Sequence, residues 1–166
     1  MPAGETYIKY QTGMSVTATN RYSYSNGTWS QNNSGDWVDA YKEWGVSLDS
    51  TALSALITPA PLKDMIENSV ATEHGKRVVT ANRKYNERTL TLGFNMTAST
   101  KADFLSRYGN FCTYVLAPGV IDLATRYQNG VVYHLDYLSC QNFGEYQQEM
   151  AKFSLRVVEP NPGNRT

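Results

Sequence analysis

The clearest pattern of apolar and polar positions lies in the segment RTLTLGFNMTASTKADFLSRYGNF, which begins at Arg88. In its first half the two kinds of residue alternate strictly. The apolar positions on one side of this stretch are Leu90, Leu92, Phe94 and Met96. Alternation of this kind is typical of a strand that packs one face on a core and turns the other away from it. We therefore predict a strand over residues 88–96.

Helical spacing follows directly after this strand. Thr100 is a residue type that caps helix N-termini, and Asp103 three positions later resembles the second member of a capping box. The apolar residues beyond the cap form a single stripe of Phe104, Leu105, Tyr108 and Phe111. We predict a short helix after Thr100 that lies on the sheet and packs this stripe against it.

Shorter segments predict further elements. Residues 51–57 favour one or two helical turns, and Asn129-Gly130 is a tight turn between two strands. The polar, charged residues 81–87 are typical of the tip of a hairpin. Additional strands are predicted at residues 43–48, 76–80, 112–116, 120–128, 131–140 and 150–158. About seven antiparallel strands with one main helix predict a mainly β (α+β), sandwich-like domain.

Residues 1–36 differ from the rest, because they contain no Leu and no Phe and are rich in Ser, Thr, Asn, Gly and Tyr. Such a segment buries too little apolar surface to fold alone. It includes a hairpin signal at Asn26-Gly27 that places Tyr24 opposite Trp29. We expect a polar N-terminal arm over residues 1–36, docked through Tyr22, Tyr24 and Trp29, and a β domain over residues 37–166. On this view, deleting the arm weakens attachment to a partner more than folding.

Composition narrows the range of partners. The 166 residues carry 15 basic and 15 acidic side chains, so the formal net charge is zero and no general attraction to nucleic acid or anionic lipid is expected. No apolar run approaches the ~20 residues of a membrane span, and the first residues do not form an export signal. For Cys112 and Cys140 the sequence favours buried free thiols over a single disulfide.

Candidate chemistry is sparse. The GxSxG, P-loop, GxGxxG and HExxH motifs are absent, and His74 and His134 lie in different predicted elements. Glycosidase acids carry no local motif, so four carboxylates are candidates for such a pair: Asp122, Asp136, Glu145 and Glu149. Asp122 and Asp136 alternate with apolar residues, as charges on a solvent face do. We expect no enzyme activity, no catalytic residues, no metal and no cofactor.

The strongest charged feature is the segment from residue 73 to residue 88. Its candidate interface residues are Lys76, Arg77, Arg83, Lys84, Tyr85 and Arg88. A solvated hairpin tip that protects a sheet edge is one interpretation. Contact with nucleic acid is a second, and pairing with acidic groups of a neighbouring copy is a third. Similarly, the aromatic arm fits either a docked segment or a carbohydrate-binding module that stacks sugar rings on Tyr22, Tyr24 and Trp29.

The order of these pieces resembles a known family. The matching segments are the WGVSL strand (44–48), the PAPLK linker (59–63), HGKRV (74–78), YNERTLTLGFNM (85–96), the helix that follows it, and FSLRVVEPNP (153–162). Together they are similar to the N-terminal domain of bacteriophage distal tail proteins, which are baseplate hub proteins, and more loosely to the phage tail-tube-like fold. The likeness spans residues 37–162.

The resemblance implies an antiparallel β-sandwich or tube-type domain with one flanking α-helix and a protruding β-hairpin. It also implies a virion structural protein whose copies, about six, close into a hexamer ring through which DNA passes without specific binding. The implied partners are further copies, the adjacent tail tube and the tail tip or baseplate, with no membrane. Virion assembly in the host cytoplasm is implied too, as is an acidic patch complementary to the basic hairpin, assigned to Asp36, Asp39 and Glu43. A tail-tube or tail-completion protein of the same fold remains an alternative.

Overall fold

The computed structural model describes residues 3–11, 13–63, 66–68, 77–79, 84–144 and 149–166. Within these ranges, nine strands form one antiparallel sheet in the order β3-β2-β4-β1-β9-β10-β11-β8-β5. The strands are β1 (Thr6–Lys9), β2 (Arg21–Ser25), β3 (Thr28–Gln31), β4 (Trp37–Asp39), β5 (Val46–Leu48), β8 (Arg88–Thr97), β9 (Val120–Thr125), β10 (Tyr133–Gly144) and β11 (Met150–Glu159). The predicted mainly β fold is confirmed.

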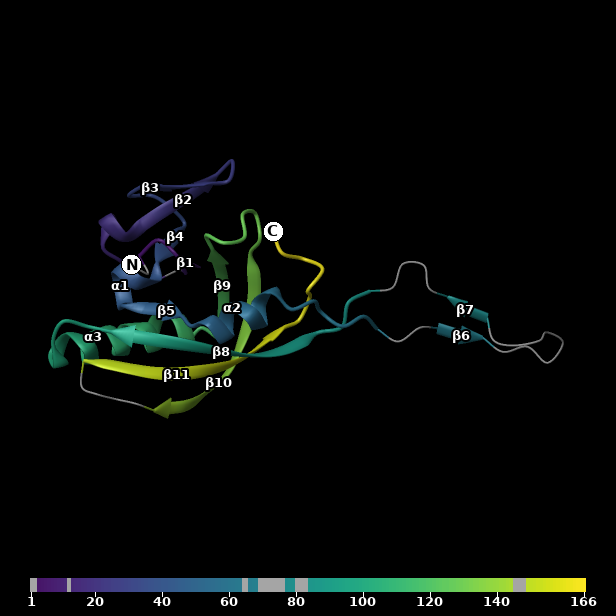
Figure 1. Ribbon diagram of the computed structural model, residues 1–166. Coiled ribbons are helices and arrows are strands. Elements are labelled where there is room, and N and C mark those ends of the chain that lie inside the picture. Colours follow the sequence, from purple (N-terminus) through teal and green to yellow (C-terminus); the bar gives the residue numbers. More distant parts are fainter. Residues whose placement is uncertain (1–2, 12, 64–65, 69–76, 80–83, 145–148) are drawn as a thin grey trace.

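The sheet curls, and short helices pack against it. Figure 1 shows β8, β10 and β11 side by side, with β9 leading from them to β1, β4 and the β2–β3 hairpin. The helices are α1 (Ala40–Trp44), α2 (Ser50–Ile57), α3 (Lys101–Phe111), the 3₁₀ helix η1 (Ala18–Asn20) and the π-helix η2 (Cys112–Leu116). Among the described residues three α-helices accompany the sheet. The sequence predicted α3 as the main helix and helical turns at residues 51–57, where α2 lies, but it did not predict α1.

The β8–β11 ladder forms the centre of the core. All ten residues of β8 pair with residues of β11, and the rings of Phe94 and Phe153 stack with centroids 5.7 Å apart. The buried positions of both strands alternate as the sequence predicts: Leu90, Leu92, Phe94 and Met96 on β8, and Ala151, Phe153, Leu155 and Val157 on β11. The predicted strands 88–96 and 150–158 are therefore confirmed.

The predicted N-cap of α3 is confirmed, but the predicted apolar stripe of the helix is buried only in part. Thr100 Oγ1 accepts a hydrogen bond from the Asp103 amide at 3.0 Å, and Phe104 and Phe111 are buried. Leu105 is exposed, so its predicted packing against the sheet is wrong. The reason is geometric, since one residue turns an α-helix by about 100° and carries Leu105 away from Phe104.

The strand predicted at residues 112–116 is wrong. These residues continue α3 as the π-helix η2, in which the Ala117 amide donates to the Cys112 carbonyl at 2.9 Å. No Pro interrupts the chain between α3 and Pro118, and Gly119, with φ +83°, follows that proline. A short apolar run without a preceding breaker does not distinguish strand from helix.

The strand predicted at residues 43–48 is shorter in the structure, where only β5 is extended. Glu43 and Trp44 belong to α1, which Asp39 caps by accepting from the amides of Tyr41 and Lys42. Gly45 then ends the helix with φ 69°, a conformation that glycine adopts readily.

The N-terminal segment is part of the main sheet. β1 lies between β4 and β9, and Tyr7 and Ile8 are buried. The expected hairpin is present, with Tyr24 opposite Trp29 and Asn26 and Gly27 both at positive φ. Because β4 begins at Trp37 and pairs with both β1 and β2, the sheet runs across the domain boundary expected after residue 36.

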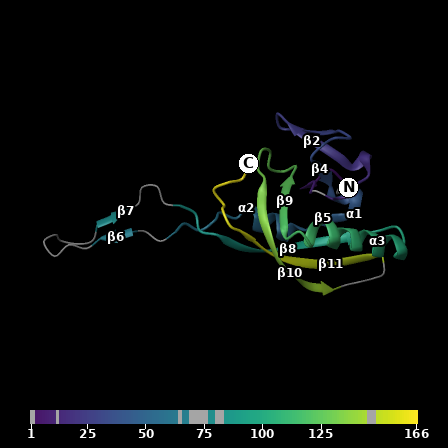
Figure 2. The same cartoon turned by 180° about the vertical axis from the view of Figure 1, so that it is seen from behind.

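Within the protruding hairpin, strand β7 pairs with a different strand from the one predicted. β7 (Arg77–Val79) pairs with β6 (Ile66–Asn68), whereas the sequence suggested pairing with the strand at 88–96. Residues 84–86 form part of the stem, because Tyr85 bridges to Leu62, so the hairpin tip predicted at residues 81–87 is wrong. The two strands lie well away from the nine-stranded body (Figures 1 and 2).

Replacing Ile8 by Ala tests whether the N-terminal segment contributes to the core. We expect Ile8→Ala to lower the free energy of unfolding by about 2–4 kcal/mol, because it leaves a cavity beneath β1. Lys9→Ala, at the exposed neighbouring position, is the matched control and should change it by less than about 0.5 kcal/mol. Urea denaturation measures both, and equal effects of the two variants would contradict the packing of β1.

Candidate assembly surface

The two legs of the hairpin leave the body as a paired stem. The Lys63 amide donates to the Lys84 carbonyl at 2.8 Å, and the Asn86 amide donates to the Pro61 carbonyl at 2.8 Å. Between these bonds Leu62 and Tyr85 form an antiparallel bridge. The first leg follows α2 and the second leads into β8, so the root of the hairpin lies where these elements meet.

An ion pair buried in the body anchors this root. Arg88, the first residue of β8, is 7% exposed, and Glu159, its ladder partner at the end of β11, is completely buried. Arg88 Nε donates to Glu159 Oε1 at 2.5 Å. Arg165 adds two hydrogen bonds to the same carboxylate, both at 2.9 Å. The carboxylate therefore joins β8, β11 and the C-terminal segment.

Arg88 also holds the end of α2. Its guanidinium donates to the carbonyls of Ala55 at 3.1 Å, Leu56 at 3.0 Å and Thr58 at 2.6 Å. Carbonyls at a helix C-terminus lack partners within the helix, and a cation there also complements the helix dipole. Arg88 is thus an anchor in the interior, and its prediction as a subunit-interface residue is wrong.

The charge on Glu159 is stabilised in this position. Burial alone would raise the pKa of the Glu159 carboxyl, but the hydrogen bonds and charges of Arg165 and Arg88 outweigh burial and hold its pKa below the ordinary value. The carboxylate is therefore ionised at neutral pH and matches the two guanidinium groups.

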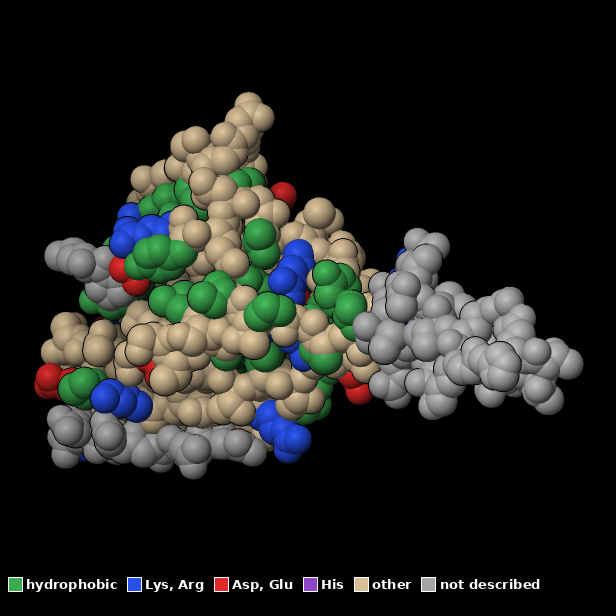
Figure 3. Space-filling view, turned by 45° about the vertical axis from the view of Figure 1, so that its right-hand side comes forward, with side chains coloured by type: hydrophobic (Ala, Val, Ile, Leu, Met, Phe, Trp, Pro, Cys, Tyr) green, Lys and Arg blue, Asp and Glu red, His purple; other side chains and the backbone are tan. Residues whose placement is uncertain are grey.

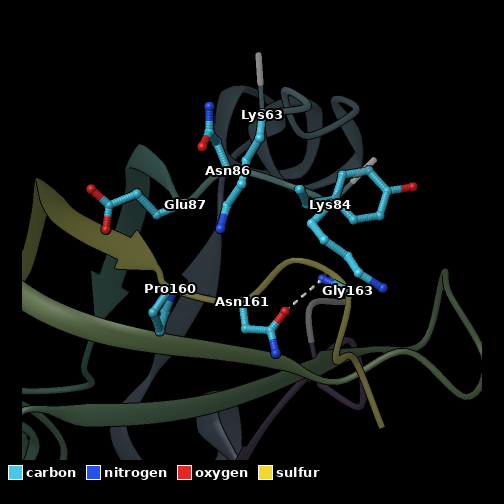
Figure 4. A pocket seen from close by; sticks show the side chains of 8 residues that line it. Lys63, Lys84, Asn86, Glu87, Pro160, Asn161 and Gly163 are labelled. Carbon is cyan, nitrogen blue, oxygen red and sulfur yellow. Dashed lines mark hydrogen bonds between the residues drawn. The ribbon is translucent and has the colours of Figure 1, made fainter. Parts of the chain in front are cut away.

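An open hollow of about 830 Å³ lies beside the root. Its lining residues are Lys63, Lys84, Tyr85, Asn86, Glu87, Pro160, Asn161 and Gly163. Figure 4 shows the Lys84 side chain reaching toward Gly163, while the Glu87 carboxylate points away from it. Ammonium and amide groups in an open hollow can bind carboxylates. This surface is suited to binding a partner.

The other candidate interface residues have different placements. Lys84 and Tyr85 are exposed at the root, where hydrophobic side chains also gather beside the hairpin (Figure 3). Arg77 lies in β7. Lys76 and Arg83 lie outside the described residues.

The acidic patch suggested as their counterpart does not form as expected. Asp39 is completely buried, and burial, which outweighs the hydrogen bonds from its neighbouring amides, raises its pKa. Glu43 accepts a hydrogen bond from Asn20 Nδ2 at 2.6 Å. Asp36 is exposed, and it is the one member of the three suited to contact with a neighbour.

The aromatic residues of the arm pack on their own chain. Trp29 stacks on Tyr7 with ring centroids 3.8 Å apart, and Tyr24 lies against it at 4.7 Å. Tyr22 is buried and accepts a hydrogen bond from Lys42 Nζ. A cavity of about 240 Å³ with almost wholly apolar walls lies between Trp29, Trp37 and the β9–β10 turn.

The described histidine and carboxylates considered for chemistry do not gather at one site. His134 contacts Asp122 at 2.6 Å and the Thr166 carbonyl at 2.9 Å, whereas Asp136 is exposed on β10. Glu149 is exposed, and His74 and Glu145 lie outside the described residues. In the part of the chain that the structure describes, no three His, Cys, Asp or Glu side chains gather as a metal site.

Both cysteines are free thiols. Cys112 is half-buried, but Cys140 is exposed, so its expected burial is wrong. None of the helices in the described ranges has the length and apolar character needed to cross a bilayer.

Comparison with known proteins finds a distantly similar solved structure and no family match. No protein-family model matches the chain, and no curated protein does. Among solved structures the chain is similar to the SPP1 Dit (gp 19.1) protein, described as a paradigm of the hub adsorption apparatus in phages that infect Gram-positive bacteria. The sequence identity is 14% and the TM-score is 0.44, over 64% of this chain and 42% of that one. The function must therefore be argued from this chain's own residues.

Replacing Arg88 by Leu tests the anchor. We expect Arg88→Leu to lower the free energy of unfolding by about 3–5 kcal/mol, because removal of one partner leaves a buried charge incompletely paired. Arg156→Leu, an exposed position on β11, is the matched control and should have little effect. Guanidinium denaturation measures both variants. A loss below about 1 kcal/mol in Arg88→Leu would refute the anchoring role.

The His134–Asp122 contact predicts a dependence of stability on pH. Burial tends to lower the pKa of His134, but the hydrogen bonds to Asp122 and the Thr166 carbonyl outweigh it and raise the pKa above its ordinary value. The raised pKa means that the contact stabilises the fold fully below about pH 6.5. The contribution disappears as pH rises through the folded-state pKa, and it is below about 1 kcal/mol because the pair is partly solvated.

Thermal unfolding from pH 5 to pH 9, compared between the natural chain and His134→Gln, measures this contribution. We expect the stability difference to shrink as pH rises. Parallel curves for the two proteins across this range would show that His134 does not couple to Asp122.

Proposed function

We propose that the chain is a structural component of a bacteriophage tail or a prophage-derived tail. In this proposal, copies of the chain form a ring that acts as a distal tail or hub adaptor. The ring joins the tail tube to the tail tip or baseplate and leaves a channel for DNA. The order of sequence elements that resembles distal tail proteins supports this role, and the role requires no catalysis.

The observation that carries the proposal is the hairpin formed by β6 and β7. It extends from the body of the molecule (Figure 1), and its stem is continuous with an anchor buried in the core. A two-stranded hairpin alone is only marginally stable in water. A surface on another molecule would stabilise a hairpin that lies away from the body, as expected for a subunit of an assembly.

The neutral charge is compatible with a channel for DNA. Many Lys and Arg side chains facing DNA would neutralise phosphates and bind them strongly. A chain with 15 basic and 15 acidic residues carries no such excess. Passage without specific binding is therefore physically reasonable for a ring of this protein.

The carbohydrate-binding alternative is less well supported. One face of Trp29 is covered by Tyr7, and Tyr24 packs against the same indole. The adjoining cavity is almost wholly apolar, whereas sugar hydroxyls need hydrogen-bonding partners. The arm aromatics are better explained as packing within the chain.

Shortening the hairpin tests the proposal. The Lys63 amide donates to the Lys84 carbonyl across the stem, so an Asn-Gly turn can replace residues 64–83 and join these two residues directly, with Lys84 retained. We expect the shortened protein to fold, because Arg88 and Glu159 are retained, but to lose ring formation. Size-exclusion chromatography with light scattering and negative-stain electron microscopy measure assembly, and thermal unfolding checks the fold.

Rings of unchanged size from the shortened protein would refute the role of the hairpin. Labelling the protein within the intact particle separates the related alternatives. A distal tail adaptor lies only at the tail end, whereas a tail-tube protein repeats along the tube.

A further inference from the structure

Two exposed surfaces of the chain combine apolar side chains with opposite charges. The first, which we call the root patch, consists of Leu62, Lys84 and Tyr85. Leu62 is 40% exposed and Tyr85 is 48% exposed, although they are paired across the hairpin stem. Lys84 lies beside Tyr85 and is exposed. The root patch therefore offers a leucine, an aromatic ring and a cation together.

The second surface, which we call the Asp136 patch, consists of Val120, Asp136 and Leu138. Val120 on β9 and Asp136 on β10 are direct cross-strand partners, so their side chains lie on the same face of the sheet. Leu138 follows at an irregularity in the β10–β11 ladder. Val120 is 47% exposed and Leu138 is 51% exposed, so two exposed aliphatic side chains accompany the carboxylate.

Several other carboxylates of the chain are already engaged. Asp39 is buried, Asp122 contacts His134, and Glu159 pairs with two arginines. Asp136 differs from them because it is exposed and has exposed apolar neighbours on two sides. It is thus an exposed carboxylate whose apolar surroundings complement the root patch.

We propose that the root patch of one copy docks on the Asp136 patch of a second copy. Lys84 meets Asp136, and Leu62 and Tyr85 pack on Val120 and Leu138. This inference rests on the proposed function, because it names the surfaces that join neighbouring subunits. The two patches are different, so the contact is heterologous and can continue from copy to copy until a ring closes.

The apolar and charged parts of this contact have separate roles. Burial of the four apolar side chains supplies affinity. The Lys84–Asp136 pair selects the partner surface and register, since a like-charge juxtaposition at the same place is strongly unfavourable. The apolar rim also excludes water from the ion pair, which reduces screening by salt.

Charge reversal in two separate proteins tests the pairing. Lys84→Glu places a carboxylate against Asp136, and Asp136→Lys places an ammonium against Lys84. We expect each variant alone to self-associate at least tenfold more weakly than the natural chain. An equimolar mixture should assemble again with the two proteins alternating. The carboxylate introduced in the first variant then meets the ammonium introduced in the second, and the unchanged Lys84 and Asp136 meet at every other contact.

Matched controls use exposed residues outside both patches. Lys101→Glu on α3 and Glu149→Lys before β11 change the net charge by the same amounts. We expect both to assemble like the natural chain. Analytical ultracentrifugation over a concentration series gives the association constants, and circular dichroism confirms that each variant is folded.

The outcomes separate this inference from the proposed function. Normal assembly of Lys84→Glu and Asp136→Lys would overturn the pairing but leave ring formation in place. The same conclusion follows if each variant fails to assemble and mixing does not restore assembly. A natural chain that stays monomeric at every concentration, and occurs singly in its particle, would overturn both the contact and the ring.

Discussion

Arg88 and Glu159 lie opposite each other in the β8–β11 ladder and form an ion pair almost completely removed from water. Two charges in such a place cost a large desolvation energy, and their attraction offsets it only when the remaining polar atoms are also satisfied. Here Arg165 donates twice to the carboxylate, and the carbonyls at the end of α2 accept from Arg88. In the described residues, no fully buried side-chain polar atom lacks a hydrogen-bond partner.

The position of this ion pair links folding to the proposed role. The chain leaves α2, runs out along the hairpin and returns at Arg88, so one guanidinium holds the elements on both sides of the excursion. A hydrophobic pair could fill the same volume, but it would leave the α2 carbonyls without this partner. The ion pair thus fixes the point where the hairpin stem leaves the body. The residues that hold the ion pair in place belong to the body and not to the stem.

The sequence correctly predicted the elements whose signals lie within a few residues. Its predictions failed where contacts with another part of the chain determine the secondary structure or the strand pairing. The alternation in β8 and β11 and the Thr100 cap needed no knowledge of the rest of the chain. The run at residues 112–116 suits a strand or a helix equally well, and continuity with α3 decided the outcome. β7 could not be assigned its partner, because β6 is only three residues long.

The anchor itself was visible in the same alternation. Arg88 shares the parity of Leu90 and Leu92, and Glu159 shares that of Leu155 and Val157, so both charges point toward the core. Their inward orientation was not predicted, because a charged residue at the end of a strand is usually solvated. Two opposite charges at core-facing positions of paired strands are a signal of a buried ion pair, provided that the strand register is known.

A net charge of zero gives the local patches more weight in assembly. Copies of a strongly charged chain would repel one another over roughly 8–10 Å at moderate salt, whatever their contact surfaces. With that repulsion absent, the encounter of two copies depends on where individual charges and exposed apolar groups lie. Basic and acidic groups that occupy different patches of one neutral subunit can therefore attract the next subunit in one orientation, and this asymmetry is what a head-to-tail ring requires.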